Sequence, residues 1–285
     1  MFIGNINTIP SIVNLPGQGV VQDQGAAFRF QRTTGGWFEA TSSSSPLGAI
    51  TNINISCWVK IDQEFFDPVT SNTDYHILDK FLNNTRAGYK LFLRNFANEN
   101  KQLKFTGVQT GVGSAEISLD ISSLQANTAY LITVSCSGFS TAEMRVIGKG
   151  VSLFQSQSAF VNPNPTASFP VFLIGNVNPT SSNQGFAGVI DEVALWPDTP
   201  DGAINETGAN NLFNWPVYKD LINSNPLGNN LQPVNWFRMG ENATQDASGN
   251  IIIPNEGTNA TSDTLISDGS PLPVKVAGIP NELYN

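Results

Sequence analysis

Short apolar segments recur along most of the chain, and turns rich in Gly, Asn, Ser and Pro separate them. Within each segment the residues alternate between two faces, as they do in β-strands. Strands are predicted at residues 28–30, 37–40, 53–61, 75–81, 89–96, 103–108, 115–121, 130–136, 143–147, 171–174 and 186–196. Because no long helical segments alternate with these strands, the pattern predicts an all-β fold, an antiparallel two-sheet sandwich.

The strand after the glycine turn at residues 185–188 carries apolar residues on both of its faces. Regular alternation predicts two opposite sets: Val189, Asp191, Val193 and Leu195 on one face, and Ile190, Glu192, Ala194 and Trp196 on the other. Such a strand needs a partner sheet on at least one face.

The two ends of the chain lack this regular pattern. Pro and Gly interrupt residues 1–24, and three prolines interrupt residues 263–285, so we expect an extended arm at each end. Residues 25–262 form the predicted body, with an extension from about residue 197. Helical spacing over residues 212–222 predicts one short helix, which Pro216 restricts to begin at that position. Strand character returns at residues 234–239 and 251–253.

Charge limits the partners. Charged residues make up 13% of the chain, and 23 Asp and Glu outweigh 14 Lys and Arg to give a net charge of −9. The basic residues form no cluster that could neutralise many phosphates, so we expect no nucleic-acid partner. Anionic membranes are disfavoured for the same reason. No apolar run approaches the roughly 20 residues that span a bilayer, so we expect no membrane association.

The chain has two cysteines, Cys57 and Cys136. Each lies within a predicted strand, and residues 1–8 lack the basic region of a secretion signal. We therefore expect a soluble, unprocessed chain with two buried free thiols that fill the core; a disulfide bridge is the alternative.

Several segments resemble, in chain order, the strands of laminin-G-like jelly rolls of the concanavalin A-like lectin and glucanase superfamily. They are residues 27–30 with 35–39 as the opening hairpin, 55–60, 127–134, 144–150 as a later hairpin, 172–176 and 190–193. The resemblance implies a jelly-roll sandwich over residues 27–196. The chain departs from the family in a Pro- and Asn-rich insert at residues 161–168 and in lacking an aromatic sugar platform.

A second block resembles a terminal block of jelly-roll proteins encoded by tailed bacteriophages. It comprises residues 235–241, 246–250 and 255–258. This resemblance implies a virion component.

Candidate catalytic groups are few. The glucanases of this fold place carboxylates on one strand face, separated by one residue, so that they flank the sugar bond. Asp191 and Glu192 are adjacent, so in a regular strand they face opposite sides, and we expect a turn-capping Asp beside a solvated Glu. His76 is the only histidine and has no Gly-x-Ser-x-Gly elbow with it, so we expect an ordinary strand-edge residue. No catalytic, cofactor-binding or metal residues are therefore assigned.

Calcium is the ion that would suit a jelly roll, because loop oxygens are hard ligands. Asp246, Ser248 and Asn250 have the alternate spacing of a calcium loop but lack a bidentate Glu. A plain Asx turn is the alternative, and the better supported one.

Aromatic residues could stack on sugars, but alternating aromatics in a sandwich mostly fill the core. The candidates are Trp37, Phe38, Trp58, Trp196, Trp215 and Trp236.

These observations favour a non-enzymatic virion structural protein of a tailed phage, a capsid decoration or fibre-associated subunit at the particle surface. Its partners would be other virion subunits, with arms that extend a neighbour's sheet, and further copies of itself in a symmetric homo-oligomer, with a trimer as one hypothesis. A lectin-like carbohydrate-binding module is the alternative, and a glycoside hydrolase is a third reading; both rest on fold analogy.

Overall fold

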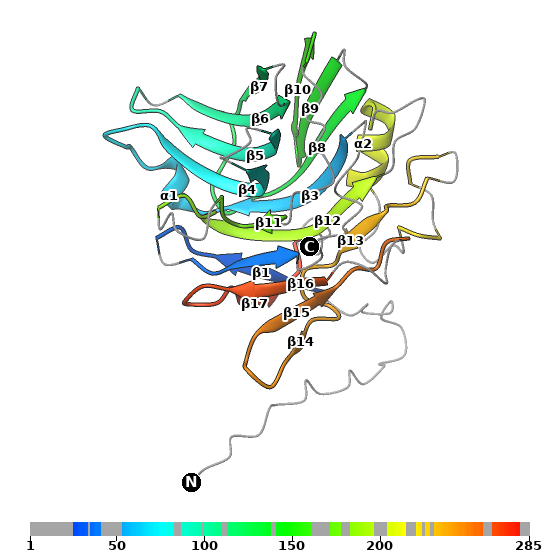
Figure 1. Cartoon of the computed structure of the whole chain (residues 1–285). Coiled ribbons are helices and arrows are strands. Elements are labelled where there is room, and N and C mark those ends of the chain that lie inside the picture. Colours follow the sequence, from blue (N-terminus) through cyan, green and yellow to red (C-terminus); the bar gives the residue numbers. More distant parts are fainter. Residues whose placement is uncertain are drawn as a thin grey trace, which may run out of the picture.

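In the computed structural model, two antiparallel sheets stack as a sandwich (Figure 1), which confirms the predicted fold class. The structure describes residues 25–33, 35–40, 53–82, 87–98, 100–109, 113–137, 141–160, 172–177, 183–196, 204–214, 221–223, 226–228, 231–258 and 264–279. Within these ranges, no helix has the length and apolar character needed to cross a membrane.

Sheet A has the strand order β10–β9–β8–β3–β12–β1–β17, and β13 lies beside β12. Its strands are β10 (Val151–Ser158), β9 (Thr141–Gly148), β8 (Ala129–Ser137), β3 (Ile53–Ile61), β12 (Gly188–Trp196), β1 (Ala26–Phe30), β17 (Val274–Ala277) and β13 (Asn235–Phe237). The described strands β17 and β10 therefore form its two edges.

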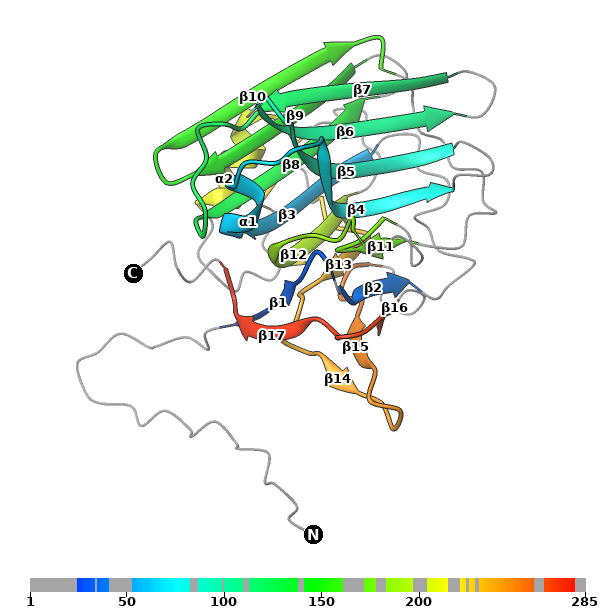
Figure 2. The same ribbon diagram turned by 90° about the vertical axis from the view of Figure 1, so that its left-hand side faces the viewer.

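Sheet B has the order β14–β15–β16–β2–β11–β4–β5–β6–β7. Its strands are β14 (Thr244–Gln245), β15 (Ile251–Pro254), β16 (Thr264–Asp268), β2 (Trp37–Ala40), β11 (Leu173–Ile174), β4 (Thr73–Leu82), β5 (Ala87–Asn95), β6 (Lys101–Gln109) and β7 (Gly113–Asp120). Figure 2 looks onto the outer face of β4–β7, with the strands of sheet A behind them.

The main core fills the space between the sheets, because alternate residues of each strand point inward. Ile55, Cys57 and Val59 of β3 face residues such as Leu91 and Phe105 across this layer. A smaller core lies on the outer face of sheet A, where the short helix α2 (Glu206–Phe213) packs. Sheet A is therefore buried on both faces around β3 and β12, as the apolar character of these strands requires.

A β-bulge interrupts the alternation in β12. Ile190 pairs with Val59 and Asp191 with Trp58, but the next regular pair is Ala194 with Ser56. Two residues of β12, Glu192 and Val193, thus lie opposite one residue of β3, and Glu192 has a φ of 47°. The predicted faces are therefore wrong beyond the bulge: Ile190 and Val193 both point into the main core, and Val189 and Ala194 both point outward.

The described helix α2 precedes the helix predicted from Pro216. Asn205 caps α2 through its side chain, which accepts the backbone N–H of Gly208 at 2.8 Å, and the helix ends at Phe213, before Pro216. Most of the predicted helix, at residues 215–220, lies outside the described residues. A single turn, α1 (Gln63–Phe66), precedes β4.

The predicted opening hairpin is instead an arch between the sheets. β1 belongs to sheet A and β2 to sheet B. The two strands stack face to face, and the rings of Phe28 and Phe38 have their centroids 4.9 Å apart. The later predicted hairpin, at residues 144–150, covers only the end of β9 and the turn at Lys149 and Gly150; the strand that pairs with β9 beyond this turn is β10, which was not predicted.

Residues 264–277, expected within an extended arm, form two strands of the sandwich. β16 pairs with β2 in sheet B, and β17 pairs with β1 in sheet A. The pairing of β16 is stabilised by burial of apolar surface, because Leu265 is fully buried. The N-terminal arm expected at residues 1–24 and the insert at residues 161–168 lie outside the described residues.

Candidate functional site

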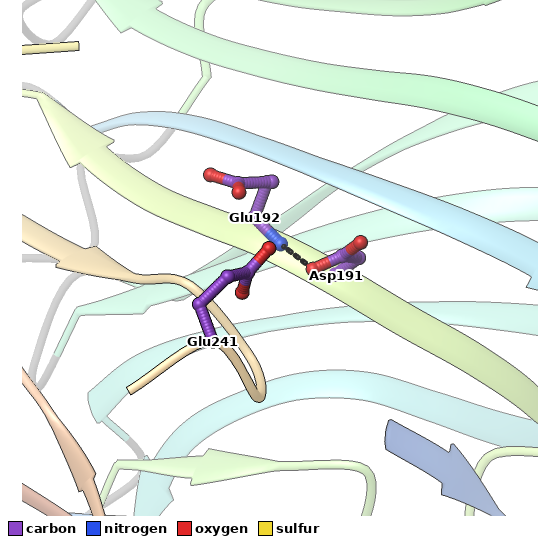
Figure 3. A group of neighbouring side chains, drawn as sticks. All are labelled: Asp191, Glu192 and Glu241. Carbon is purple, nitrogen blue, oxygen red and sulfur yellow. Dashed lines mark hydrogen bonds between the residues drawn. The ribbon is translucent and has the colours of Figure 1, made fainter. Parts of the chain in front are cut away.

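The bulge in β12 brings three carboxylates together on sheet A: Asp191, Glu192 and Glu241 (Figure 3). One carboxylate oxygen from each lies within 4.8 Å of the others. They meet where the neighbour of β12 changes from β1, paired at residues 188–190, to β13, paired at residues 193–195. We call these three residues the acidic cluster.

Asp191 is almost fully buried, at 1% exposure, and both of its oxygens accept backbone hydrogen bonds. Oδ1 accepts the N–H of Glu192 at 2.9 Å. Oδ2 accepts the N–H of Ile279 at 2.9 Å, which joins the segment after β17 to the middle of β12. A buried carboxylate satisfied in this way stabilises local backbone geometry.

Glu192 is held by the terminal block that follows it by more than 40 residues. Its Oε2 accepts the indole Nε1 hydrogen of Trp236 at 2.6 Å, and its Oε1 lies 3.4 Å from Nε of Arg238. The Arg238 guanidinium also lies 3.8 Å from Glu241 and 3.9 Å from Glu256. One arginine therefore faces three glutamates.

Glu241 completes the cluster from the turn after β13. The preceding residue, Gly240, has a φ of 135°, and a Cβ there would lie 2.8 Å from that of Ala26. Only glycine allows this turn to pass so close to β1. The Glu241 side chain is 14% exposed, and its Oε2 has no hydrogen-bond partner.

Burial raises the pKa of all three carboxyl groups, and repulsion within the cluster adds to the effect at Asp191 and Glu241. Burial raises the pKa of Asp191 well above its ordinary value, and the charges of Glu192 and Glu241 add to the effect. Burial also raises the pKa of Glu192, although Arg238 opposes the shift. The pKa of Glu241 is raised to about 7, first by burial and then by Glu192. The cluster therefore holds protons at a pH where exposed carboxylates have lost them.

Carboxylate oxygens at this spacing are the type of ligand that a hard cation such as calcium prefers. Here, however, both oxygens of Asp191 and both of Glu192 already face protein donors. Only Oε2 of Glu241 lacks one. These protein donors favour a structural role for the cluster, in which it joins β12 to β13 and to the segment after β17, over a metal centre or a pair of catalytic acids.

This arrangement corrects the expectation for Asp191 and Glu192. The prediction of opposite faces and a solvated Glu is wrong, because the positive φ of Glu192 rotates the strand and the bulge breaks the alternation. The Glu192 side chain is only 16% exposed. Apolar residues occupy both odd and even positions of β12, which is a weak signal in the sequence that a bulge changes the alternation. Nothing in the sequence links this strand to Glu241.

His76 also differs from the prediction. It lies on β4, an inner strand of sheet B, and is only 2% exposed. Its ring stacks on Phe92 at 5.0 Å between centroids, and Nδ1 lies 3.6 Å from Oδ2 of Asp79. Burial lowers the pKa of His76 to about 3, and Lys90 and Arg94 contribute. The imidazole is therefore neutral at physiological pH.

The proposed calcium loop is an Asx turn between β14 and β15. Oδ1 of Asp246 accepts the backbone N–H of Ser248 at 2.8 Å and of Asn250 at 2.9 Å. Oδ2 accepts the side-chain amide of Asn250 at 3.0 Å. These bonds lower the pKa of Asp246. The Asp246 carboxylate thus organises the hairpin tip.

The described aromatics and thiols fill the cores, as expected. Trp37, Phe38, Trp58, Trp196 and Trp236 are all buried, and Trp215 lies outside the described residues. Cys57 and Cys136 are buried free thiols, which confirms that prediction. Burial raises the pKa of Cys57 to about 12 and also raises that of Cys136.

The outer face of sheet B is a second cluster of polar groups. Arg94 forms two hydrogen bonds with the carboxylate of Asp74, at 2.5 and 2.7 Å, and Lys104 pairs with Glu116. No described helix or strand covers this face in Figure 2. Arg94, Asp74 and Glu116 are partly exposed beside the half-buried ring of Phe96, whereas Lys104 is buried.

No family model and no curated protein matches the chain. Among solved structures, it is similar to a pentraxin from Limulus polyphemus described as heptameric, with a TM-score of 0.45, 12% identity, and coverage of 66% of this chain and 82% of that one. The CBM40 of a Ruminococcus gnavus IT-sialidase bound to alpha2,3 sialyllactose gives a TM-score of 0.40 and 12% identity over 59% of this chain and 88% of that one.

Tailspike protein 2 of an Escherichia coli O157:H7 bacteriophage gives a TM-score of 0.41 and 10% identity. That match covers 61% of this chain but only 23% of the tailspike. At these scores the likeness is confined to the coarse β-sandwich arrangement and assigns no function.

Proposed function

We propose that this chain is a non-enzymatic structural subunit of a tailed-phage virion, a capsid decoration or fibre-associated protein. One observation carries the proposal: the described body begins and ends at one place. The backbone N–H of Gly278 donates to the carbonyl of Gly25 at 3.3 Å. The first and last described segments therefore lie side by side where β1 pairs with β17 in sheet A. A rigid body tethered at one end suits a subunit that anchors there and displays its other end.

The terminal block also supports the proposal. Residues 235–258, which resemble a block of tailed-phage jelly-roll proteins, supply β13 to sheet A and both β14 and β15 to sheet B. Through Trp236 and Arg238 this block also holds Glu192. The block is thus an integral part of both sheets.

Three candidate reactive side chains, Asp191, His76 and Cys57, have structural roles, which favours a non-enzymatic subunit. The oxygens of Asp191 bind backbone N–H groups, and His76 is buried as a neutral ring. Cys57 is a fully buried thiol with a raised pKa. Catalysis requires groups that reach a substrate, and these groups are occupied or covered.

The test compares incorporation of the full chain with that of a variant lacking residues 1–24. Tagged copies of each are produced during particle assembly, and purified particles are probed for the tag. The variant should keep the thermal melting of the body but lose incorporation. A matched variant lacking residues 280–285 measures the contribution of the other segment. Full incorporation of the variant lacking residues 1–24 would contradict the proposal.

Glycan binding on the outer face of sheet B is a second candidate function. The partly exposed bidentate Arg94–Asp74 pair and the Glu116 carboxylate beside it offer donors and acceptors of the kind that sugar hydroxyls require. A glycan array should show binding that Arg94→Ala abolishes and that Lys275→Ala, on the far edge of sheet A, leaves intact. Equal binding by both variants would locate the site elsewhere, and reducing-sugar release would favour a hydrolase.

A further inference from the structure

The four sheet edges of the described sandwich differ in how they are protected. An exposed edge strand offers unpaired backbone groups to other chains, and proteins usually block it with charge, proline or short length. β14 has two residues, β7 carries Glu116 and Asp120, and β17 has four residues with Lys275 among them and Pro273 just before. Each of these three edges is therefore protected against pairing.

β10 has none of these protections. It is eight residues long, and its sequence, Val-Ser-Leu-Phe-Gln-Ser-Gln-Ser, contains no charged residue and no proline. Most of its residues are exposed, and Phe154 has 48% of its surface exposed. Its one neighbour among the described strands of sheet A is β9. β10 lies at the end of the sandwich away from β17, where sheets A and B meet at their edges (Figure 2).

We propose that β10 is a self-association edge, where two copies of this chain pair antiparallel and join their A sheets into one continuous sheet. The inference concerns the chain's own association and goes beyond the proposed virion role. A second copy is the occupant that fits this edge, because β10 has no charged residue and two acidic chains can therefore approach here. The chain has a net charge of −9, so most surfaces of two copies repel one another. Two β10 strands meet without opposing carboxylates.

The geometry of β10 is also self-complementary. Phe154 pairs with Arg145 and Ser156 with Glu143 of β9, so the even-numbered residues of β10 lie on the outer face of sheet A. A two-fold axis perpendicular to the sheet keeps outer faces together and makes the strands antiparallel. Residues that face each other in an antiparallel pair point to the same side of the sheet, so an even-numbered residue of one copy must face an even-numbered residue of the other. The two-fold axis must therefore pass beside a residue and not between two residues. The residues nearest the middle of β10 are Phe154 and Gln155.

Either axis buries the exposed Phe154 ring. With the axis at Phe154, the two rings face each other. With the axis at Gln155, each ring lies opposite Ser156 of the other copy. In both cases the Arg145 guanidinium, 3.9 Å from the centroid of the Phe154 ring, covers its other side. Pairing therefore buries an apolar side chain and satisfies edge backbone groups at once.

The test places a charge beside the axis in the purified full chain. Sedimentation velocity from about 1 to 100 μM should show the unmodified chain passing from monomer to dimer. Gln155→Lys introduces two like charges near the axis and should weaken dimerisation by about tenfold or more. Because Gln155 is exposed, thermal melting should stay unchanged. Val274→Lys, on the β17 edge, is the matched control and should dimerise normally.

Disulfide trapping gives an independent measurement. Oxidation of a Gln155→Cys or Phe154→Cys variant should yield a covalent dimer, because facing residues of an antiparallel pair approach within disulfide range. A Val274→Cys variant should remain monomeric. A monomeric unmodified chain across the whole range, or trapping at Val274 and not at β10, would overturn the proposal. Equal weakening by Gln155→Lys and Val274→Lys would also overturn it, in favour of head-to-tail pairing of unlike edges.

Discussion

Asp191 in the middle of β12 accepts the backbone N–H of Ile279 through Oδ2 at 2.9 Å, although 88 residues separate them along the chain. The same side chain accepts the N–H of Glu192 at the bulge. One buried carboxyl thus holds the strained strand and the segment that closes sheet A.

Asp191→Ala should destabilise the fold, because two backbone N–H groups lose their acceptor in a buried setting. Each unsatisfied group costs about 1–3 kcal/mol. Urea unfolding at pH 5, where repulsion within the acidic cluster is weakest, measures the loss. Asp120→Ala is the matched control, because Asp120 also accepts a backbone N–H, that of Ser122, but is exposed. A loss for Asp191→Ala no larger than for this control would contradict the structural role.

Glu241→Gln should become stabilising as pH rises. The pKa of Glu241 is raised to about 7 in the fold, so the folded chain binds more protons than the unfolded chain between the ordinary glutamate pKa and that value. The stability of the parent protein therefore falls as pH rises through this window. Glu241→Gln avoids this loss. The free energy of unfolding of the variant, relative to the parent protein, should therefore be higher at pH 8 than at pH 5 by on the order of 3 kcal/mol.

Chemical denaturation at a series of pH values measures this difference. Glu206→Gln, at the exposed start of α2, is the control for the Glu-to-Gln substitution itself. A stability difference for Glu241→Gln that does not grow with pH would show that the pKa of Glu241 is not raised in the fold.

His76→Phe should become stabilising as pH falls, which is the opposite pH dependence to that of Glu241→Gln. The pKa of His76 is lowered to about 3, so the unfolded chain binds the extra proton between pH 6.5 and 3. The contribution of the neutral ring is present above pH 6.5 and is lost as pH falls. Phe keeps the stacking on Phe92 without titrating, so the variant should gain relative to the parent protein on acidification. Because the chain has no other histidine, a difference that stays constant from pH 7 to 4 would refute the shift.

Cys57 and Cys136 should not react with a thiol reagent in the native protein at pH 8. Both are fully buried, and burial raises the pKa of both thiols. Absorbance at the end of the reaction should count two thiols only after urea is added. The Val274→Cys variant, with its thiol on an exposed edge, provides the positive control. Rapid native labelling of either natural cysteine would contradict its position in the core.

Local pattern predicted the strands that alternate most clearly. The predicted segments 37–40 and 53–61 coincide with β2 and β3, because alternating apolar residues bury one face against the other sheet. β10 was missed, because an edge strand rich in Ser and Gln buries little and has no apolar period. β16 and β17 were missed, because nearby prolines suggested an arm. Pairing with β2 and β1 decides their structure.

The sequence by itself determined the fold class, the apolar strands and the burial of the aromatics and thiols, because these depend on which side chains leave water. The tertiary structure alone decided the acidic cluster, the neutral state of His76 and the exposure of the β10 edge. Each depends on groups distant along the chain: Glu241 reaches Asp191 only because β13 pairs with β12. Local periodicity fixes the faces of a strand, whereas its neighbours, bulges and charge environment follow from how the whole chain packs.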